Sequence, residues 1–274
     1  MNCKRILTIQ DISCVGQCSM TVAMPILSAC GHECCILPTA ILSTHTGGFG
    51  KPAVVHLDGS LEAMWKHWKE NHITFDAIYT GYLGSVGAVK AAEEIAADLL
   101  APGGKLIVDP AMADHGKRYS GLDETYAEAM ARLCTKADIL LPNVTEAAML
   151  TNREYREDLA EADVRQILED LPQQTVVLTG VGFEPGTTGI ALWEEERYSH
   201  ISHRKVDRSF HGTGDMFAAA FTGALLRGRT AQEAAAVASE FVLRSIELTV
   251  SAPAHWYGVR FEPVLGELSR MVSE

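Results

Sequence analysis

The chain has 274 residues, of which 47% are apolar and 21% are charged. This composition is typical of a globular protein and excludes an intrinsically disordered chain, which could not bury enough apolar surface to fold. There are 23 Lys and Arg residues against 35 Asp and Glu residues, so the net charge is −12. We expect no binding to nucleic acid or to an anionic membrane surface from so acidic a chain.

The first residues contain no apolar stretch as long as that of a secretory signal, which needs about 7–15 residues. No apolar run approaches the ~20 residues that cross a bilayer. The cysteines number seven, and an odd number favours free thiols in a reducing compartment. We therefore expect a cytoplasmic protein.

Short apolar runs alternate with helical patterns along almost the whole sequence. The expected strands span residues 5–9, 34–42, 77–82, 106–108, 139–141 and 175–178, followed by an antiparallel pair at 189–193 and 198–206. The expected helices span residues 19–30, 60–71, 85–100, 124–134, 145–151, 162–171, 215–226, 231–248 and 263–272. This order predicts one α/β domain over residues 1–274, with a mostly parallel central sheet, helices on both faces and an antiparallel edge.

Polar residues gather directly after the expected strands. They lie at residues 10–11, 43–50, 81–85, 109–119, 142–146 and 179–182. Open parallel sheets bind ligands outside the carboxyl ends of their strands, so these clusters are expected to share one site. The P-loop, Gly-x-Gly-x-x-Gly, Gly-x-Ser-x-Gly and His-Glu-x-x-His motifs are all missing, which argues against the enzyme classes that depend on them.

The sequence Gly212-Thr213-Gly214-Asp215 begins a long apolar helix. Two glycines allow close backbone approach to a ligand, and the free N–H groups at a helix start attract phosphate oxygens. A carboxylate there could accept the proton of an attacking hydroxyl. The alternative is an ordinary turn with a helix cap.

A second pattern, Asn143-Val-Thr-Glu146, follows the expected strand at 139–141. It can be a capping box, in which the two side chains satisfy the start of a helix. It can equally hold Mg2+, directly or through water, beside the phosphates of a nucleotide. Asp109 places another carboxylate at a strand end, where a turn residue is the simpler interpretation.

These motifs stand in the order in which they occur in the ribokinase superfamily, and the chain resembles in particular the pyridoxal kinases, including pyridoxamine kinases. The matching segments are residues 8–10, 42–47, 80–85, 108–112, 141–146, 177–180 and 212–219. The resemblance implies ATP-dependent phosphorylation of the 5′-hydroxymethyl group of a B6 vitamer in pyridoxal 5′-phosphate salvage. It also implies Mg2+ and a homodimer, and it allows a monovalent cation such as K+.

The resemblance assigns a role to each matching residue. The base is Asp215 and the anion hole is Gly212, Thr213 and Gly214; Asn143, Thr179, Asp109 and Glu146 would bind ATP, with Asp109 and Glu146 also serving the metal. Asp11, Thr46 and Tyr82 would bind the acceptor, and residues 113–119, including Asp114, Lys117 and Tyr119, would form a mobile lid.

Some positions depart from the family pattern. Asp11 stands where Ser is common, and a carboxylate there would favour pyridoxamine by pairing with its amine or ring nitrogen. Gly47-Gly48-Phe49 replaces a bulky aromatic residue, and His211 and the tail at 255–258 receive no assignment, although the tail could border either the nucleotide or a partner subunit. Hydroxymethylpyrimidine kinase in thiamine synthesis and a non-catalytic vitamer-binding protein remain as alternatives.

Overall fold

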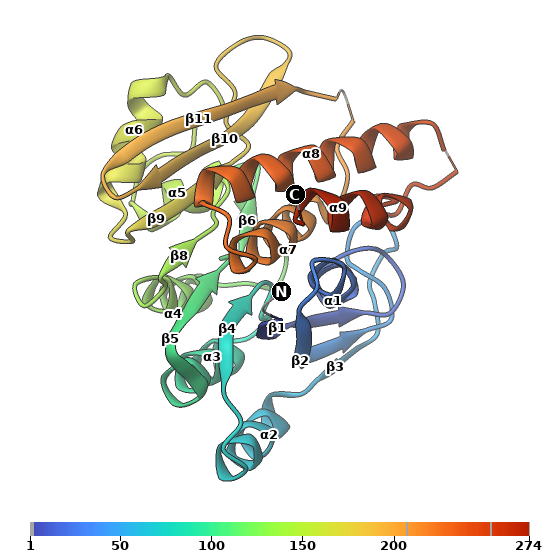
Figure 1. Cartoon of the computed structure of the whole chain (residues 1–274), viewed down its shortest axis with the longest axis vertical. Coiled ribbons are helices and arrows are strands. Elements are labelled where there is room, and N and C mark those ends of the chain that lie inside the picture. The colour runs from blue at the N-terminus through green and yellow to red at the C-terminus, as the bar shows by residue number, and fades with distance from the viewer. Residues whose placement is uncertain (1–2, 207, 253, 274) are drawn as a thin grey trace.

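The computed structural model describes residues 3–206, 208–252 and 254–273. A nine-stranded sheet runs through the molecule with helices on both sides, and a two-stranded hairpin accompanies it (Figure 1). The strands are β1 (Arg5–Ser13), β2 (Glu33–Leu42), β3 (Val54–His56), β4 (Phe75–Thr80), β5 (Leu100–Val108), β6 (Ala113–Asp114), β7 (Lys117–Arg118), β8 (Ile139–Leu140), β9 (Thr175–Thr179), β10 (Thr187–Glu194) and β11 (Arg197–Arg204). The helices are α1 (Met20–Ala29), α2 (Asp58–Glu70), α3 (Val86–Leu99), α4 (Glu124–Cys134), α5 (Val144–Leu150), α6 (Glu161–Asp170), α7 (Thr213–Leu226), α8 (Ala231–Val250), the 3-10 turn η1 (Glu262–Val264) and α9 (Leu265–Met271).

The strand order in the large sheet is β11-β10-β9-β8-β5-β4-β1-β2-β3. The strands from β9 to β2 pair in parallel, whereas β3 at one edge and β10 and β11 at the other pair antiparallel. The predicted fold class is therefore confirmed, with antiparallel strands at both edges of the sheet. The carboxyl ends of the six parallel strands lie along one edge of the molecule, which is where such sheets bind ligands.

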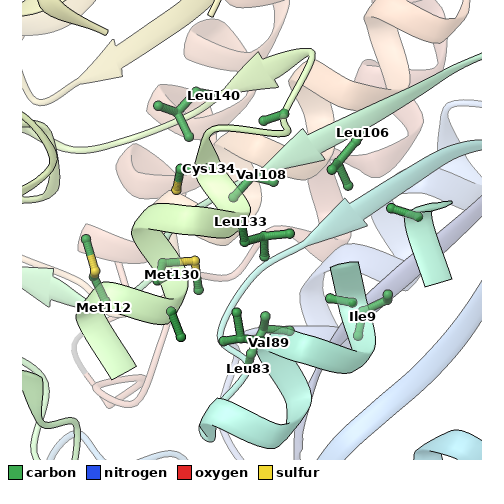
Figure 2. Packing of buried hydrophobic residues seen from close by; sticks show 14 of the residues in the cluster. Ile9, Leu83, Val89, Leu106, Val108, Met112, Met130, Leu133, Cys134 and Leu140 are labelled. Atoms are coloured by element: carbon green, nitrogen blue, oxygen red, sulfur yellow. The ribbon is translucent and has the colours of Figure 1, made fainter. Parts of the chain in front are cut away.

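Each face of the sheet supports its own apolar core. Ile6 packs with α1, α7, α8 and α9, while the next residue, Leu7, packs with α2 to α6 on the opposite face. Figure 2 shows the second core, where Val108 of β5 lies close to Leu133 and Cys134 of α4. Strands that are covered on both faces need apolar residues at consecutive positions, which explains the apolar runs in the sequence.

Side chains at the helix starts stop several helices from fraying. Ser85 accepts a hydrogen bond from the amide of Ala88 at 3.0 Å and caps α3. Asp123 caps α4 in the same way, through the amide of Tyr126 at 3.0 Å. Each cap satisfies one of the helix N–H groups that have no partner inside the helix, and is typically worth about 1 kcal/mol.

Many element ends differ from the expected ones by a few residues, and β1 ends at Ser13 rather than Ile9. Three further differences concern whole elements or a long extension. Strand β3 was not expected, because its three residues are all exposed and show no apolar alternation. The β6–β7 hairpin was not expected either, because each of its strands has two residues. Strand β5 begins at Leu100 rather than Leu106, since residues 101–104 bulge out of the ladder without ending it. Within the described residues, no helix has the length and apolar character needed to cross a membrane.

Candidate active site

Loops that follow the parallel strands bring the predicted polar residues to one edge of the sheet. Asp11 lies near the end of β1, Asp109 follows β5 and Thr179 ends β9. Asp215, in the first turn of α7, belongs to the same group, since the charge of Asp11 raises the pKa of Asp215 and the charge of Asp215 raises the pKa of Asp109. Residues that are 204 positions apart in sequence (11 and 215) thus form one cluster of carboxylates.

The glycines before Asp215 have different steric surroundings. Gly212 has φ 83°, and a Cβ on it would lie 1.9 Å from the backbone carbonyl oxygen of Gln17. An L side chain is therefore excluded at this position by both backbone conformation and contact. A Cβ on Gly214 would meet no atom within 4 Å, so this side of the loop is open to an approaching ligand. The predicted anion hole, including Thr213 as the first residue of α7, thus forms an accessible helix start.

Asp215 is half-buried in the first turn of α7. Burial, followed by the nearby charge of Asp11, raises its pKa from 3.8 to about 7, while the backbone N–H of Ser19 opposes this shift. A group with a pKa close to the working pH is well suited to general-base catalysis, because it accepts a proton readily and is still partly ionised. Asp215 is therefore the strongest candidate for the base.

Asp109 lies directly after β5, and only 9% of its surface is exposed. One of its oxygens accepts a hydrogen bond from the amide of Ala111 at 3.1 Å. Burial raises its pKa well above the ordinary value, and the charges of Glu146 and Asp215 add to the effect. The charges of Glu146 and Asp215 thus disfavour ionisation of Asp109, and a bound cation would offset that effect.

Asn143 and Glu146 form the capping box of α5. The side chain of Asn143 accepts from the amide of Glu146 at 3.0 Å, and Glu146 accepts from the amide of Asn143 at 3.0 Å. The other oxygen of Glu146 accepts from the backbone amide of Met112 at 2.9 Å, and the side-chain Nδ2 of Asn143 donates to the carbonyl of Ala113 at 2.8 Å. The pair therefore both starts a helix and anchors the root of the β6–β7 hairpin.

These contacts restrict how Glu146 could serve a metal. Both of its oxygens already accept backbone hydrogen bonds and 1% of the residue is exposed, so it presents no free oxygen to a cation. Burial raises its pKa to about 7, against the opposing effect of those amides. Asp109 keeps one oxygen without a protein partner among the described hydrogen bonds. The contacts of Asp109 therefore fit direct coordination of a metal ion. Those of Glu146 fit only an effect on the ion through a water molecule or through its charge.

In the part of the chain that the structure describes, no three His, Cys, Asp or Glu side chains converge as a metal cage. Mg2+ commonly binds through one or two carboxylates together with water and the phosphates of a substrate. The hard oxygen of Asp109 suits such a partial site. Thr179 lies beside Asn143 across a parallel bridge, and its hydroxyl donates to the carbonyl of Pro142 at 3.4 Å.

The predicted lid is the β6–β7 hairpin and the residues after it. His115 and Gly116 form its turn with φ 49° and 74°, and the amide of Gly116 donates to the hydroxyl of Thr145 at 3.0 Å. Its side chains at Asp114, Lys117 and Tyr119 are exposed. The ring of Tyr119 lies 6.4 Å from that of Tyr82, so the segment after the hairpin reaches one of the residues predicted to bind the acceptor.

Asp11, the residue that departs from the family pattern, is 3% exposed. It accepts a hydrogen bond from the hydroxyl of Ser13 at 3.1 Å, and its own amide donates to the carbonyl of Tyr82 at 3.1 Å. Burial raises its pKa, while the hydroxyls of Ser19 and Ser13 oppose the change. The carboxyl group is therefore buried beside Ser13 and not on the surface, and the main chain of Asp11 is bonded to that of Tyr82.

Thr46, the remaining predicted acceptor residue, lies exposed on the loop after β2. Its neighbours form an aromatic cluster that the sequence did not predict. The ring of His45 lies 5.0 Å from Phe49 and 5.1 Å from His211, and Phe49 lies 4.7 Å from Trp256. The cluster joins segments far apart in the chain, so its only signal in the sequence was the presence of unassigned aromatic residues.

Comparison with known proteins adds to this geometry. The family model of phosphomethylpyrimidine kinase matches residues 26–259. A Bacteroides thetaiotaomicron protein assigned as a phosphomethylpyrimidine kinase superposes with a TM-score of 0.93 at 32% identity, over 98% of this chain and 94% of its own. A second crystal form of that protein contains pyridoxal and superposes with a TM-score of 0.91 over 97% and 96% of the two chains.

Two kinases of B6 vitamers are also similar to this chain. Pyridoxal kinase from Lactobacillus plantarum superposes with a TM-score of 0.91 at 31% identity, over 98% of each chain. The pyridoxine/pyridoxal/pyridoxamine kinase of Bordetella bronchiseptica is 27% identical over 264 residues, which cover 90% of each chain.

Proposed function

Because this chain belongs to the phosphomethylpyrimidine kinase family, we propose that it phosphorylates the 5′-hydroxymethyl group of a B6 vitamer with ATP. The observation that carries the proposal is the position of Asp215 in the first turn of α7, beside Gly214 and across from the buried Asp11. The similarity to vitamer kinases along almost the whole chain supports the choice of acceptor. The product, a vitamer 5′-phosphate, would serve pyridoxal 5′-phosphate salvage.

The proposed reaction is an in-line phosphoryl transfer. Asp215 accepts the proton of the acceptor hydroxyl while that oxygen forms a bond to the γ-phosphorus, and the bond between this phosphorus and the oxygen of ADP breaks. The free amides of Gly212, Thr213 and Gly214 at the start of α7 would stabilise the charge on the transferred group. Most of the catalytic effect in such transfers comes from positioning and from charge stabilisation.

The nucleotide is expected on the side of β8, β9 and the hairpin. There Asn143 and Thr179 border the end of the sheet, and Lys117 supplies an exposed positive charge that offsets the acidity of the protein. Mg2+ held by Asp109, with Glu146 behind it, would neutralise the charge of the phosphates. A monovalent cation such as K+ would help to neutralise the same phosphate charges. The hairpin with Asp114 and Tyr119 would keep water from the γ-phosphate.

On the acceptor side we infer contacts from Asp11, Thr46 and Tyr82. A buried carboxylate at Asp11 would attract a ring N–H or an ammonium group, because an unpaired buried charge is costly. All three vitamers have the ring nitrogen, but only pyridoxamine also carries an ammonium group. We therefore place pyridoxamine first among the three vitamers.

A pyrimidine acceptor is indicated by the name of the family model and by the assignment of the Bacteroides relative, and hydroxymethylpyrimidine is the member of that class with a free hydroxymethyl group. The experiment is turnover of the purified protein with ATP and Mg2+ against pyridoxal, pyridoxamine, pyridoxine and hydroxymethylpyrimidine. We expect the highest specificity constant for a vitamer. Phosphorylation of the pyrimidine alone would contradict the proposal, and vitamer binding without turnover would indicate a non-catalytic binding protein.

We also propose that a second copy of this chain covers the sheet edge at β3. Val54 and Val55 there are 42% and 59% exposed, and Ile41 on the neighbouring β2 is 37% exposed. An exposed apolar edge strand favours association with another chain. Light scattering after size exclusion should give the mass of a dimer, and Val55→Lys should shift it toward the monomer. A monomeric native protein would contradict this proposal.

A further inference from the structure

The segment between α8 and η1 crosses the acceptor side of the site. We define residues 255–261 as the C-terminal strap. The backbone carbonyl of Tyr257 accepts a hydrogen bond from His45 at 2.8 Å, and the indole of Trp256 lies against Phe49. A Cβ on Gly48 would lie 2.8 Å from the indole, so the two segments are in direct contact.

The tautomer of His45 follows from the two hydrogen bonds of its ring. Its Nδ1 accepts a hydrogen bond from the amide of Gly47 at 2.9 Å, so Nε2 carries the proton and donates it to Tyr257. The imidazole thereby connects the strap to the backbone immediately after Thr46. A Cβ on Gly47 would lie 2.3 Å from His211, the residue that precedes the anion hole. The loop at 45–49 is therefore held between the strap and the start of α7.

Gln17 fixes the strap at its other side. Its amide nitrogen donates to the carboxylate of Glu262 at 2.6 Å, and its amide oxygen accepts from the Nε2 of His255 at 2.7 Å. A Cβ on Gly258 would lie 2.8 Å from the side chain of Gln17. Through its backbone carbonyl, the same residue is in contact with Gly212. One residue thus touches the anion hole by its main chain and the strap by its side chain.

We propose that Gln17 and the C-terminal strap are positioning elements for the acceptor, which hold the loop at 45–49 in place beside the anion hole. The inference rests on the proposed function only for the identity of the acceptor. Small errors in the placement of a reacting group cost large factors in rate, so a loop that carries acceptor contacts benefits from such a support. The strap acts through Thr46 and Phe49 and does not take part in the chemical step.

The test uses Gln17→Ala, which removes the side-chain bonds to His255 in the strap and to Glu262 directly after it, and leaves the carbonyl at Gly212 unchanged. We expect the KM of the acceptor to rise about fivefold or more, with the KM of ATP unchanged. Amide exchange with deuterium in residues 45–49 should accelerate by about tenfold. Glu262→Gln keeps the oxygen that accepts from Gln17, and this matched control should behave as the native protein.

A second variant, Trp256→Ala, tests the contact between the strap and the loop at 45–49. Because Trp256 is 49% exposed, this variant should fold normally. It should raise the acceptor KM and the exchange at 45–49 in the same manner, and Trp256→Phe should restore both. Unchanged exchange, or an equal loss of affinity for acceptor and ATP, would overturn the inference. If the native protein phosphorylates none of the acceptors, the proposed function fails, and the exchange measurement still tests the strap.

Discussion

The backbone carbonyl oxygen of Gln17 occupies the space beside Gly212 that any Cβ would need, at 1.9 Å from the ideal Cβ position. This contact fixes the start of α7 against the loop that precedes α1. It also distinguishes two glycines that look equivalent in the sequence. Gly212 is required by the protein itself, whereas Gly214 faces open space and is free for a ligand.

Gly212→Ala is expected to destabilise the fold. The new methyl group would clash with the carbonyl of Gln17, and φ 83° is unfavourable for alanine, with a combined cost of about 1–3 kcal/mol or more. Gly214→Ala should leave the melting temperature near that of the native protein and still reduce turnover, because the methyl group would project toward the phosphate. Thermal melts and steady-state kinetics check both, and native turnover in Gly214→Ala would argue against the anion hole.

Asp215→Asn is expected to lower kcat by about 10²–10⁴, the usual value of a general base, while the affinity for ATP is retained. The substitution removes an ionised group from a site where burial disfavours charge, so at pH 8 the variant should melt no lower than the native protein. Single-turnover kinetics and calorimetry make the measurement. Near-native turnover would remove Asp215 from the role of base.

The raised pKa of Asp215 predicts the pH dependence of the reaction. Only the ionised carboxylate can accept the hydroxyl proton, and its pKa is about 7 instead of 3.8. The specificity constant for the acceptor should therefore rise with pH through about 7, and it should fall about tenfold for each pH unit below 6. A profile between pH 5 and 9 would show this limb. A plateau down to pH 5 would mean that the base titrates elsewhere.

Asp11→Ser should change acceptor preference from pyridoxamine toward pyridoxal. The serine removes the buried carboxylate that would pair with a cationic or N–H group, and it keeps a small hydroxyl near Ser13. Specificity constants for the two vitamers, compared as a ratio, make the test. Asp11→Asn serves as a control of equal size, and it should show the same direction of change because it also lacks the charge. An unchanged ratio in both variants would exclude this contact.

Asn143→Ala should lose the cap of α5 and the bond to Ala113, at a cost of about 1–2 kcal/mol. Asn143→Asp keeps an oxygen for the cap and loses only the amide donor to Ala113. Of the two, the aspartate variant should be the more stable, and both should raise the KM of ATP if the hairpin borders the nucleotide. Equal stability of the two variants would show that the cap contributes little.

The sheet and most helices were predicted from local patterns. Strands covered on both faces carry short apolar runs, such as residues 77–79 of β4 and 176–178 of β9, and caps such as Ser85 mark where helices start. The resemblance to pyridoxal kinases is confirmed at the level of the family. The β6–β7 hairpin could not be predicted, because its stability comes from Glu146 and Thr145, about 30 residues further along the chain.

The aromatic cluster and the strap could not be predicted from the sequence for a related reason. The bond between His255 and Gln17 joins residues separated by 238 positions, and no local pattern encodes such a pair. The role of Glu146 was only partly predictable as well. The capping-box pattern was visible, but its bonds to Met112 and Ala113 depend on how the chain returns after β5.

The hydrogen bonds of Glu146 make the attachment of the β6–β7 hairpin depend on the protonation of one carboxyl group. The carboxylate that starts α5 also holds the amides of Met112 and Ala113, and burial brings its pKa to about 7. Uptake of one proton near neutrality would weaken the grip on both amides at once. Mild acidification would therefore loosen the attachment of the β6–β7 hairpin at Met112 and Ala113, without any change at its turn.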